Sequence, residues 1–381
     1  MTEFEDVLAD AGRILKKYHL CDYCMGRLFS KRLCLKSNKL LGRRLKRGMV
    51  RTEKCYICRD IYPELDFLLG LMLESSSGYY FDTFATGTQI KPSIIDRDDH
   101  IRSKFKLQGT DGIKTDITRE LSRRFAKKTG KTLDSLDSDV TLTINIKNKT
   151  CQIRSKPVMI QGRYTKTERN FPQKQQPCGN CSGRGCQECS MHGIINFESV
   201  EGKISKMLFA KFGCTTIKFT WIGGEDSTSL ILGNGRPFFA RLQNPSKRYL
   251  QFPHRLYLGF VTLYGCKVID SLPKMPIKFF STIKIKISTE KPVTSSDLKN
   301  LKVALSQPIV VYEPSGKRSE KSISHVRYRK ISGNKFVLVL DAEGGLPVKR
   351  FVEGDETSLN VGQILGVPCK CVRFDFMQVY Q

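Results

Sequence analysis

The sequence predicts an α+β protein that begins with a four-cysteine module, continues with a small α/β domain and ends with a larger domain on a mixed, largely antiparallel sheet. Three observations support this architecture. Eight of the 14 cysteines fall in four Cys-x-x-Cys pairs. A helical periodicity and then a strand periodicity follow one another between residues 61 and 160. From Phe197 to the C-terminus, short apolar segments typical of strands dominate.

The balance of charge is the most unusual feature of the composition. Among 381 residues the formal net charge is +27. Such an excess favours partners with dense negative charge, which means nucleic acid or anionic lipid. The apolar run Leu65–Leu73 is too short to span a bilayer, and the acidic opening of the chain lacks the order of a signal peptide. We therefore expect a soluble, cytoplasmic protein that binds RNA or DNA and no membrane. The alternative is a basic protein tuned only for solubility.

The first segment, residues 1–60, is expected to hold a metal ion. An amphipathic helix over Phe4–Lys17 precedes two cysteine pairs. Two thiolate pairs on short turns can point four sulfur atoms at one ion and complete a tetrahedral zinc site. The alternative is two pairs of buried or redox-active thiols. The predicted ligands are Cys21, Cys24, Cys55 and Cys58.

Between these two pairs the stretch Lys31–Arg51 carries nine Lys or Arg and no acid. Its leucines predict a helix with a narrow apolar stripe and a basic face. Such a run is often only a solvated face. Beside a metal module in a strongly basic chain, contact with backbone phosphate is the better interpretation. The candidate contacts are Arg43, Arg44, Lys46 and Arg47.

Residues 61–165 are expected to form a small α/β domain that binds RNA. Apolar residues recur every four positions from Ile113 to Phe125, which predicts a helix with cations on its other faces. Strict alternation from Val140 to Ile146, a turn-like KNKT and a second apolar alternation then predict a hairpin. Cations mixed with an aromatic ring follow, as in many contacts to loop RNA. The RNA-binding candidates in this domain and at the start of the linker after it are Arg123, Arg124, Lys127, Arg163, Tyr164, Lys166 and Arg169.

A linker over residues 166–196 is expected to contain a second zinc site. Its two cysteine pairs are separated by a short stretch in which Gly183 and Gly185 permit tight turns. Four thiolates leave no open position for water, so the site is structural rather than catalytic. The predicted ligands are Cys178, Cys181, Cys186 and Cys189. We expect two structural zinc ions and no organic cofactor.

The last segment, residues 197–381, is expected to be the catalytic domain. Helical patterns over Val200–Phe212 and Ser295–Leu305 interrupt its strands. Walker-type loops, dinucleotide fingerprints, HExxH and GxSxG do not occur, so nucleotide-driven and zinc-hydrolase chemistries have no support. One feature contrasts with the basic chain: the acidic pair Glu225-Asp226 lies in a tight turn between two glycine-rich stretches. The alternative, purely structural interpretation is that this acidic pair caps the N-terminus of a short helix.

Three collinear stretches resemble one family, the tRNA pseudouridine synthases with a THUMP domain, the tenth pseudouridine synthase family of archaea and eukaryotes. They are GGEDSTSLILGNGRPF, QGRYTKTERNFPQ with PCGNCSGRGCQEC, and LDAEGGLPVKRFVEGDETSLNVGQILG. The resemblance extends over essentially the whole chain. It implies a THUMP-like fold for the 61–165 domain, a pseudouridine synthase fold for the last segment, tRNA as partner, and action on uridine 54, uridine 55 or both in the TΨC arm.

The resemblance also implies site residues. Asp226 matches the family's catalytic aspartate, Lys349 a cation near it, and Phe280 a strand position where the family carries Tyr, with Phe279 the neighbouring choice of register. A phosphate contact or a surface lysine is the alternative for Lys349, and a core residue of an ordinary strand is the alternative for either phenylalanine. We count further cations of this domain as RNA contacts: Arg236, Lys247, Arg248, Arg327 and Arg329.

Departures from the family keep a second function open. Gly224 stands where the family has Arg, and Arg241 where members often have Glu. A catalytically weak or inactive tRNA-binding protein with the same fold is therefore the alternative to the synthase. A THUMP-linked methyltransferase or thiolase is disfavoured, because neither a glycine-rich cofactor loop nor a PP-loop follows the N-terminal domains. No protein partner can be inferred.

Overall fold

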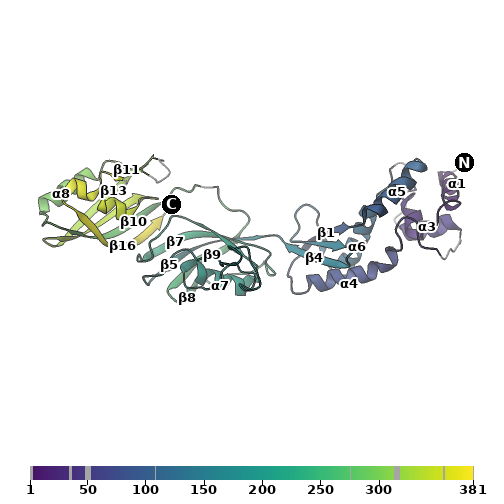
Figure 1. Ribbon diagram of the computed structural model, residues 1–381, viewed down its shortest axis with the longest axis horizontal. Helices are drawn as coiled ribbons and strands as arrows, with labels where there is room; N and C mark the ends of the chain where they lie inside the picture. The colour runs from purple at the N-terminus through teal and green to yellow at the C-terminus, as the bar shows by residue number, and fades with distance from the viewer. Residues whose placement is uncertain are drawn as a thin grey trace. The chain divides into compact units, whose positions relative to one another are not determined.

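The computed structural model describes residues 3–33, 37–47, 53–107, 109–274, 276–312, 318–354 and 357–380. The chain divides into two compact units, Met1–Lys156 and Pro157–Gln381, each with its own hydrophobic core (Figure 1). Within the basic stretch Lys31–Arg51, residues 34–36 and 48–51 lie outside the described residues. No helix in the described ranges is long and apolar enough to cross a membrane.

The first unit combines helices with a four-stranded sheet. Its helices are α1 (Glu3–Leu15), α2 (Asp22–Arg27), α3 (Asn38–Lys46), α4 (Leu65–Ser76), α5 (Pro92–Lys104) and α6 (Ile113–Thr129), with a 3-10 turn over Tyr62–Glu64. Its strands are β1 (Thr83–Gln89), β2 (Thr132–Leu133), β3 (Val140–Asn145) and β4 (Thr150–Ser155). In the order β2-β1-β3-β4, β1 runs parallel to both neighbours, and β3 and β4 form the predicted antiparallel hairpin. Helices α4 and α6 pack on this sheet.

A buried ion pair joins the cysteine module to the α/β part of this unit. The Arg27 guanidinium of α2 contacts the Asp98 carboxylate of α5, and both side chains are 1% exposed. Arg27 Nη1 also donates to the carbonyl of Asp111, 2.5 Å away. A buried charge needs such partners, because desolvation of an unpaired ion is costly. The segments expected at 1–60 and 61–165 thus share one compact unit up to Lys156.

The second unit is built on a nine-stranded sheet. Its principal strands are β5 (Val158–Lys166), β6 (Ile217–Trp221), β7 (Ile231–Leu242), β8 (Arg255–Leu258), β9 (Val261–Ile269), β10 (Phe280–Thr289), β13 (Ile323–Ser332), β14 (Lys335–Glu343) and β16 (Cys369–Tyr380). The order is β13-β14-β10-β16-β7-β5-β9-β8, with β6 also paired to β7. β7 and β16 pair in parallel, whereas the other pairs are antiparallel. The mixed, largely antiparallel sheet is therefore confirmed.

Helices and a small sheet complete this unit. The helices are α7 (Val200–Phe212), α8 (Ser295–Ala304), α9 (Val348–Glu353) and α10 (Val361–Leu365), and the small sheet pairs β12 (Arg318–Lys321), β11 (Ile309–Tyr312) and β15 (Thr357–Ser358). The two helices predicted from the sequence correspond to α7 and α8.

Strand β5 differs from its expected place at the end of the RNA-binding segment. It hydrogen-bonds to β7 on one side and β9 on the other, so it lies inside the sheet of the second unit. Val158, Ile160 and Tyr164 on one face of β5 are buried in that core. The physical reason is pairing at long range: the partners of β5 follow much later in the chain, so its own alternation could not reveal them.

Candidate active site and cysteine clusters

The acidic turn lies between the end of β6 at Trp221 and the start of β7 at Ile231. Gly223, which opens the turn, has φ +80°. A Cβ added there would lie 2.5 Å from Arg236 Nη1 and 2.5 Å from the Phe279 ring. Left-handed backbone and close packing together require glycine at this position. The turn is thereby held tightly against the sheet.

Glu225 points into the protein and lies among three polar side chains from neighbouring strands. Its carboxylate accepts a hydrogen bond from the Tyr164 hydroxyl at 2.7 Å. Lys166 Nζ lies 3.1 Å from Glu225 Oε1, and neither side chain has exposed surface. Arg236 Nε is 3.7 Å from the other oxygen, too far for a hydrogen bond. Burial and the negative charge of Glu225 raise the pKa of Tyr164 well above its usual value. Tyr164, Lys166, Glu225 and Arg236 are called the Glu225 cluster below.

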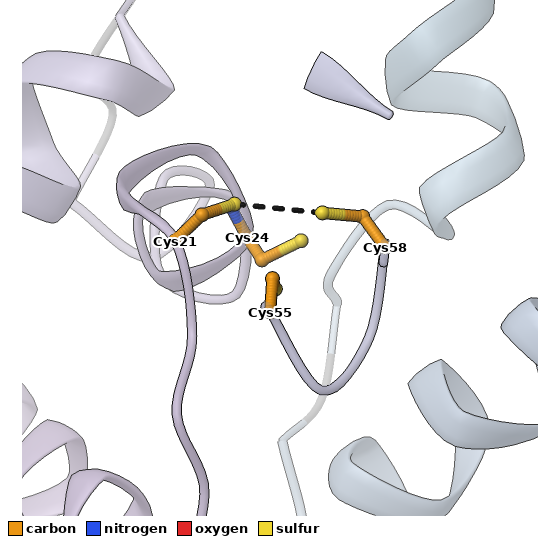
Figure 2. Close-up of side chains that lie close together, drawn as sticks. All are labelled: Cys21, Cys24, Cys55 and Cys58. Atoms are coloured by element: carbon orange, nitrogen blue, oxygen red, sulfur yellow. Dashed lines mark hydrogen bonds between the residues drawn. The ribbon is translucent and has the colours of Figure 1, made fainter. Parts of the chain in front are cut away.

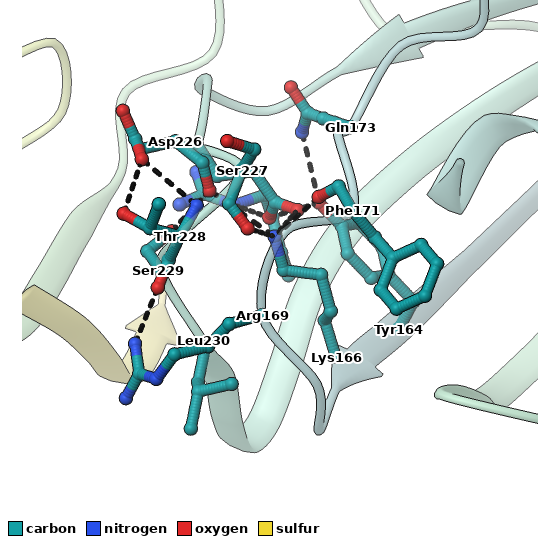
Figure 3. A network of polar contacts seen from close by, with 12 residues as sticks. Tyr164, Lys166, Arg169, Phe171, Gln173, Asp226, Ser227, Thr228, Ser229 and Leu230 are labelled. Carbon is teal, nitrogen blue, oxygen red and sulfur yellow. Dashed lines mark hydrogen bonds and ion pairs between the residues drawn. The ribbon is translucent and has the colours of Figure 1, made fainter. Parts of the chain in front are cut away.

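The Lys166 ammonium also holds the main chain of the turn, as Figure 3 shows. It donates to the carbonyl oxygens of Phe171 at 3.0 Å, Asp226 at 3.2 Å and Ser227 at 3.3 Å. Gln173 Nε2 donates to the Tyr164 hydroxyl at 2.9 Å. The Glu225 cluster is therefore an internal support for the backbone that carries Asp226.

A second clamp holds the other end of the turn. Arg169 makes a two-pronged ion pair with Asp375 of β16, with N–O distances of 2.7 and 2.9 Å. Arg169 also donates to the carbonyl of Thr228. Asp375 in turn accepts a hydrogen bond from Leu230 N at 3.0 Å. Paired donors on a planar guanidinium fix geometry better than a single contact.

The Asp226 side chain is 28% exposed and faces a cation. Lys349 Nζ, from the first turn of α9, lies 2.8 Å from Asp226 Oδ2. The other oxygen accepts from Thr228 N at 2.9 Å and Thr228 Oγ1 at 2.5 Å. Partial burial opposes ionisation, but the hydrogen bonds from Lys349 and Thr228 outweigh it and lower the pKa of Asp226 to about 2. An ionised, oriented carboxylate results.

The aromatic ring beside the turn belongs to Phe279. Added Cβ atoms at Gly223 and at Gly344 would lie 2.5 and 2.2 Å from this ring. Phe280 is 38% exposed and stacks on Tyr380, with ring centroids 6.2 Å apart. Neighbouring residues of an extended segment point to opposite sides. Packing against the turn thus favours Phe279 over the expected Phe280.

Three predicted RNA contacts are corrected by their burial. Tyr164 and Lys166 are fully buried, and Arg236 is 1% exposed. Arg236 Nη1 donates to the carbonyl of Ile222 at 2.9 Å, and its guanidinium lies 4.3 Å from the centre of the Phe376 ring. These side chains cannot reach RNA in this structure, because they form the Glu225 cluster. The sequence reasoning missed this cluster; the acid next to Asp226 was its only local signal.

The remaining predicted RNA contacts divide by exposure. Five are at least partly buried and interact with other protein groups: Lys46, Arg124, Arg163, Arg169 and Arg248. Eight are exposed: Arg43, Arg44, Arg47, Arg123, Lys127, Lys247, Arg327 and Arg329.

Each set of four predicted zinc ligands converges. The sulfur atoms within each set all lie within 4.8 Å of one another. Figure 2 shows the first set, in which Cys21 Sγ and Cys58 Sγ are 3.6 Å apart. In the second set the S–S separations include 3.7, 3.8 and 3.9 Å. Tetrahedral zinc with bonds of about 2.3 Å requires about 3.8 Å between sulfur atoms. Both clusters therefore fit a zinc ion.

Two family models and two relatives match this chain over most of its length. Residues 71–145 match the family model described as the archaeal Pus10 THUMP domain, and residues 159–255 and 276–380 match the Pus10 C-terminal model. A tRNA pseudouridine synthase Pus10 of Nitrosopumilus maritimus is 51% identical over 100% of this chain and 99% of that protein. The protein of the same name from Cenarchaeum symbiosum is 35% identical over 95% of this chain and 90% of its own. A crystal structure of a Cbf5-Nop10-Gar1 complex is 10% identical and covers 58% of this chain and 48% of its own, with a TM-score of 0.30.

Proposed function

This chain belongs to the Pus10 family and is a tRNA pseudouridine synthase, and on that premise we propose that Asp226 is the carboxylate with which it isomerises uridine. The proposed targets are uridine 54, uridine 55 or both in the TΨC arm of tRNA. The main support for this role of Asp226 is the hydrogen bond of 2.8 Å that its Oδ2 accepts from Lys349 Nζ.

The chemistry needs an anion next to the ribose. The bond between C1′ of the ribose and N1 of uracil must break, the base must turn, and C1′ must then bond to C5. An ionised Asp226 can attack the sugar or stabilise the oxocarbenium-like charge that develops on it. The proton on C5 leaves and N1, freed from C1′, gains one, so the reaction is an isomerisation. Lys349 keeps Asp226 ionised and oriented before the glycosidic bond breaks.

The aromatic partner in this proposal is Phe279. Its ring lies against Gly223, beside the turn that carries Asp226, which supports a stacking role toward the extruded uracil. A phenylalanine cannot accept the C5 proton, so it positions the base only. A tRNA-binding protein with weak chemistry remains the second candidate, because Gly224 offers no side chain where the family has Arg.

Metal and compartment are parts of the same proposal. Each cysteine cluster would hold one zinc ion, bound by four thiolates and serving structure alone. We place the RNA-binding part at the N-terminal side, ending at Lys156, and the enzyme in the cytoplasm, where tRNA is processed.

The deciding experiment uses an unmodified tRNA transcript. Wild type and Asp226→Asn are incubated with it, and pseudouridine is mapped at every uridine. We expect product at position 54 or 55 with wild type and none with the variant, while both proteins bind the transcript equally. Absence of product from wild type under all conditions would leave the binding protein as the function.

A further inference from the structure

A cavity of about 510 Å³ adjoins the acidic turn on the side of Gly223 and Gly224. This volume lies in the range of about 300–1,000 Å³ that is usual for small-ligand sites. Its other lining residues are Gln173, Lys174, Glu201, Phe219 and Trp221. Asp226 and Phe279 do not line it, so it is distinct from the place proposed for the target uracil.

One wall of the cavity is aromatic and rigid. Phe219 and Trp221, two residues apart on β6, stack with ring centroids 5.0 Å apart and 5° between the planes. Tyr164 of the Glu225 cluster packs edge-on against Trp221, 5.6 Å away and at 81°. Both wall residues keep partial exposure. Partly exposed, fixed aromatic surface is what an unstacked nucleobase binds, with little dependence on its identity.

The polar lining suits a nucleotide. Lys174 is exposed and offers a cation for a phosphate. Glu201, from the first turn of α7, already accepts hydrogen bonds from Gln175 N at 3.4 Å and from Trp221, and the remaining lone pairs of its carboxylate can accept one from a ring N–H or an amino group. Gln173 Nε2 donates to the carbonyl of Gly223 at 3.2 Å and to the Tyr164 hydroxyl, so the cavity is tied to the turn that carries Asp226.

Gly224 lines the cavity and borders open space. A Cβ added there meets no atom within 4 Å, so a larger side chain at this position can occupy space beside the cavity without displacing neighbouring atoms.

From this geometry we propose that the cavity is a second nucleobase subsite. It takes one unstacked base of the tRNA loop, other than the target uracil, between the Phe219–Trp221 wall and Glu201, with Lys174 near its phosphate. This inference rests on the proposed action on tRNA. Holding a neighbouring base apart from the stack would help to keep the target nucleotide extruded, since a flipped base otherwise returns to its partners.

The single tryptophan of the chain reports directly on this subsite. Asp226→Asn protein is titrated with an unmodified tRNA transcript, and Trp221 emission is followed beside an independent measurement of binding. Stacking of a base should quench the emission by at least twofold at saturation. A fully double-helical RNA of equal length, which offers no loop base, should bind with less than a tenth of that quenching. Unchanged emission at tRNA saturation would overturn the proposal.

Gly224→Leu tests the entrance without disturbing packed atoms. The added side chain should reduce quenching by more than half while the Kd for tRNA changes less than threefold. Full quenching in this variant would count against base entry into the cavity.

A scan of abasic sites in the tRNA loop identifies the base. With wild type, one abasic position other than the target should lower the single-turnover rate at least tenfold. Trp221→Leu should turn over intact tRNA slowly. Its rate should fall no further when the tRNA carries that abasic site. Trp221→Phe, which keeps an aromatic ring, should be less impaired. If the loss from Trp221→Leu and the loss from the abasic site multiply at every position, Trp221 does not contact any of the removed bases, and the proposal is refuted. Because quenching is measured on the Asp226→Asn protein, a failure of the role proposed for Asp226 would leave this readout unaffected.

Discussion

The ammonium of Lys166 lies 3.1 Å from the carboxylate of Glu225, and neither side chain has any exposed surface. Removal of one member of such a pair leaves an uncompensated buried charge, which costs about 3–5 kcal/mol. We therefore expect Lys166→Met to destabilise the second unit by an amount of that order. Urea unfolding followed by Trp221 emission measures this, because the only tryptophan belongs to that unit.

Two further variants test whether the loss comes from the pair. Lys166→Met combined with Glu225→Gln should recover part of the stability, since no unpaired ion remains. Arg318→Met breaks an ion pair with Glu320 whose members are 60% and 59% exposed, and should cost below about 1 kcal/mol. Equal losses in Lys166→Met and Arg318→Met would contradict a supporting role for the Glu225 cluster.

The pH dependence of turnover should report on Lys349. Because the pKa of Asp226 is lowered to about 2, its ionisation should not limit the rate anywhere above about pH 4. Lys349→Met removes a cause of this lowering, so the acidic limb of the kcat profile should move to higher pH. Arg350→Met, on the next residue of α9, serves as the control. If the acidic limb does not move in Lys349→Met, Lys349 does not control the ionisation of Asp226.

The same shift predicts a change in stability with acid. A carboxyl group whose folded pKa is depressed stabilises the fold above its unfolded pKa. That contribution disappears as the pH falls from the ordinary value of 3.8 through about 2. Asp226→Asn should therefore show a smaller loss of second-unit stability than wild type across this window. Parallel curves for the two proteins would argue against the contact with Lys349 in solution.

The two adjacent phenylalanines should behave differently. Phe279→Leu removes the ring beside Gly223 and should lower the single-turnover rate at least tenfold with little change in tRNA affinity. Phe280→Leu should stay within about threefold of wild type, because its exposed ring stacks on Tyr380 and not on the turn. A tenfold loss would correspond to about 1.4 kcal/mol of barrier. A larger loss of rate in Phe280→Leu than in Phe279→Leu would instead identify Phe280 as the ring beside the uracil.

Metal content can be checked directly. We expect two zinc ions per chain and partial unfolding after chelation, because four convergent thiolates exist only in the folded chain and zinc binding therefore stabilises folding. Cys178→Ser should lose one zinc and much stability. Cys266→Ser, outside both clusters, should keep both ions. A full complement of zinc in Cys178→Ser would remove Cys178 from the ligand set.

Affinity for tRNA should fall steeply with salt. Each neutralised phosphate releases counterions and adds about 0.7–0.9 to the slope of log K against log salt. Replacing exposed Arg44, Arg47, Arg123 and Lys127 by Gln should flatten this slope. Deletion of residues 1–156 leaves β5 in its sheet and should weaken binding strongly. Unchanged affinity after this deletion would place the RNA contacts in the second unit.

Local patterns in the sequence were sufficient for several features. Cys-x-x-Cys spacing indicated which cysteines converge, because each pair lies on one short turn that brings its two sulfur atoms together. The hairpin of β3 and β4 and the helix α6 follow from periodicities that involve only neighbouring residues. The resemblance of the GGEDSTSLILGNGRPF stretch was sufficient to select Asp226 as the candidate catalytic carboxylate.

Other features depended on contacts between distant parts of the chain, so only the tertiary structure decided them. From the sequence, Lys166 and Tyr164 were predicted to contact RNA. In the structure they are buried supports of the turn, because β5 pairs between β7 and β9. The choice of Phe279 over Phe280 depends on which side of the segment faces Gly223. The contact of Lys349 with Asp226 joins residues 123 positions apart. Burial and orientation arise from the pairing of remote strands, and a single sequence records the alternation of a strand but not its partner.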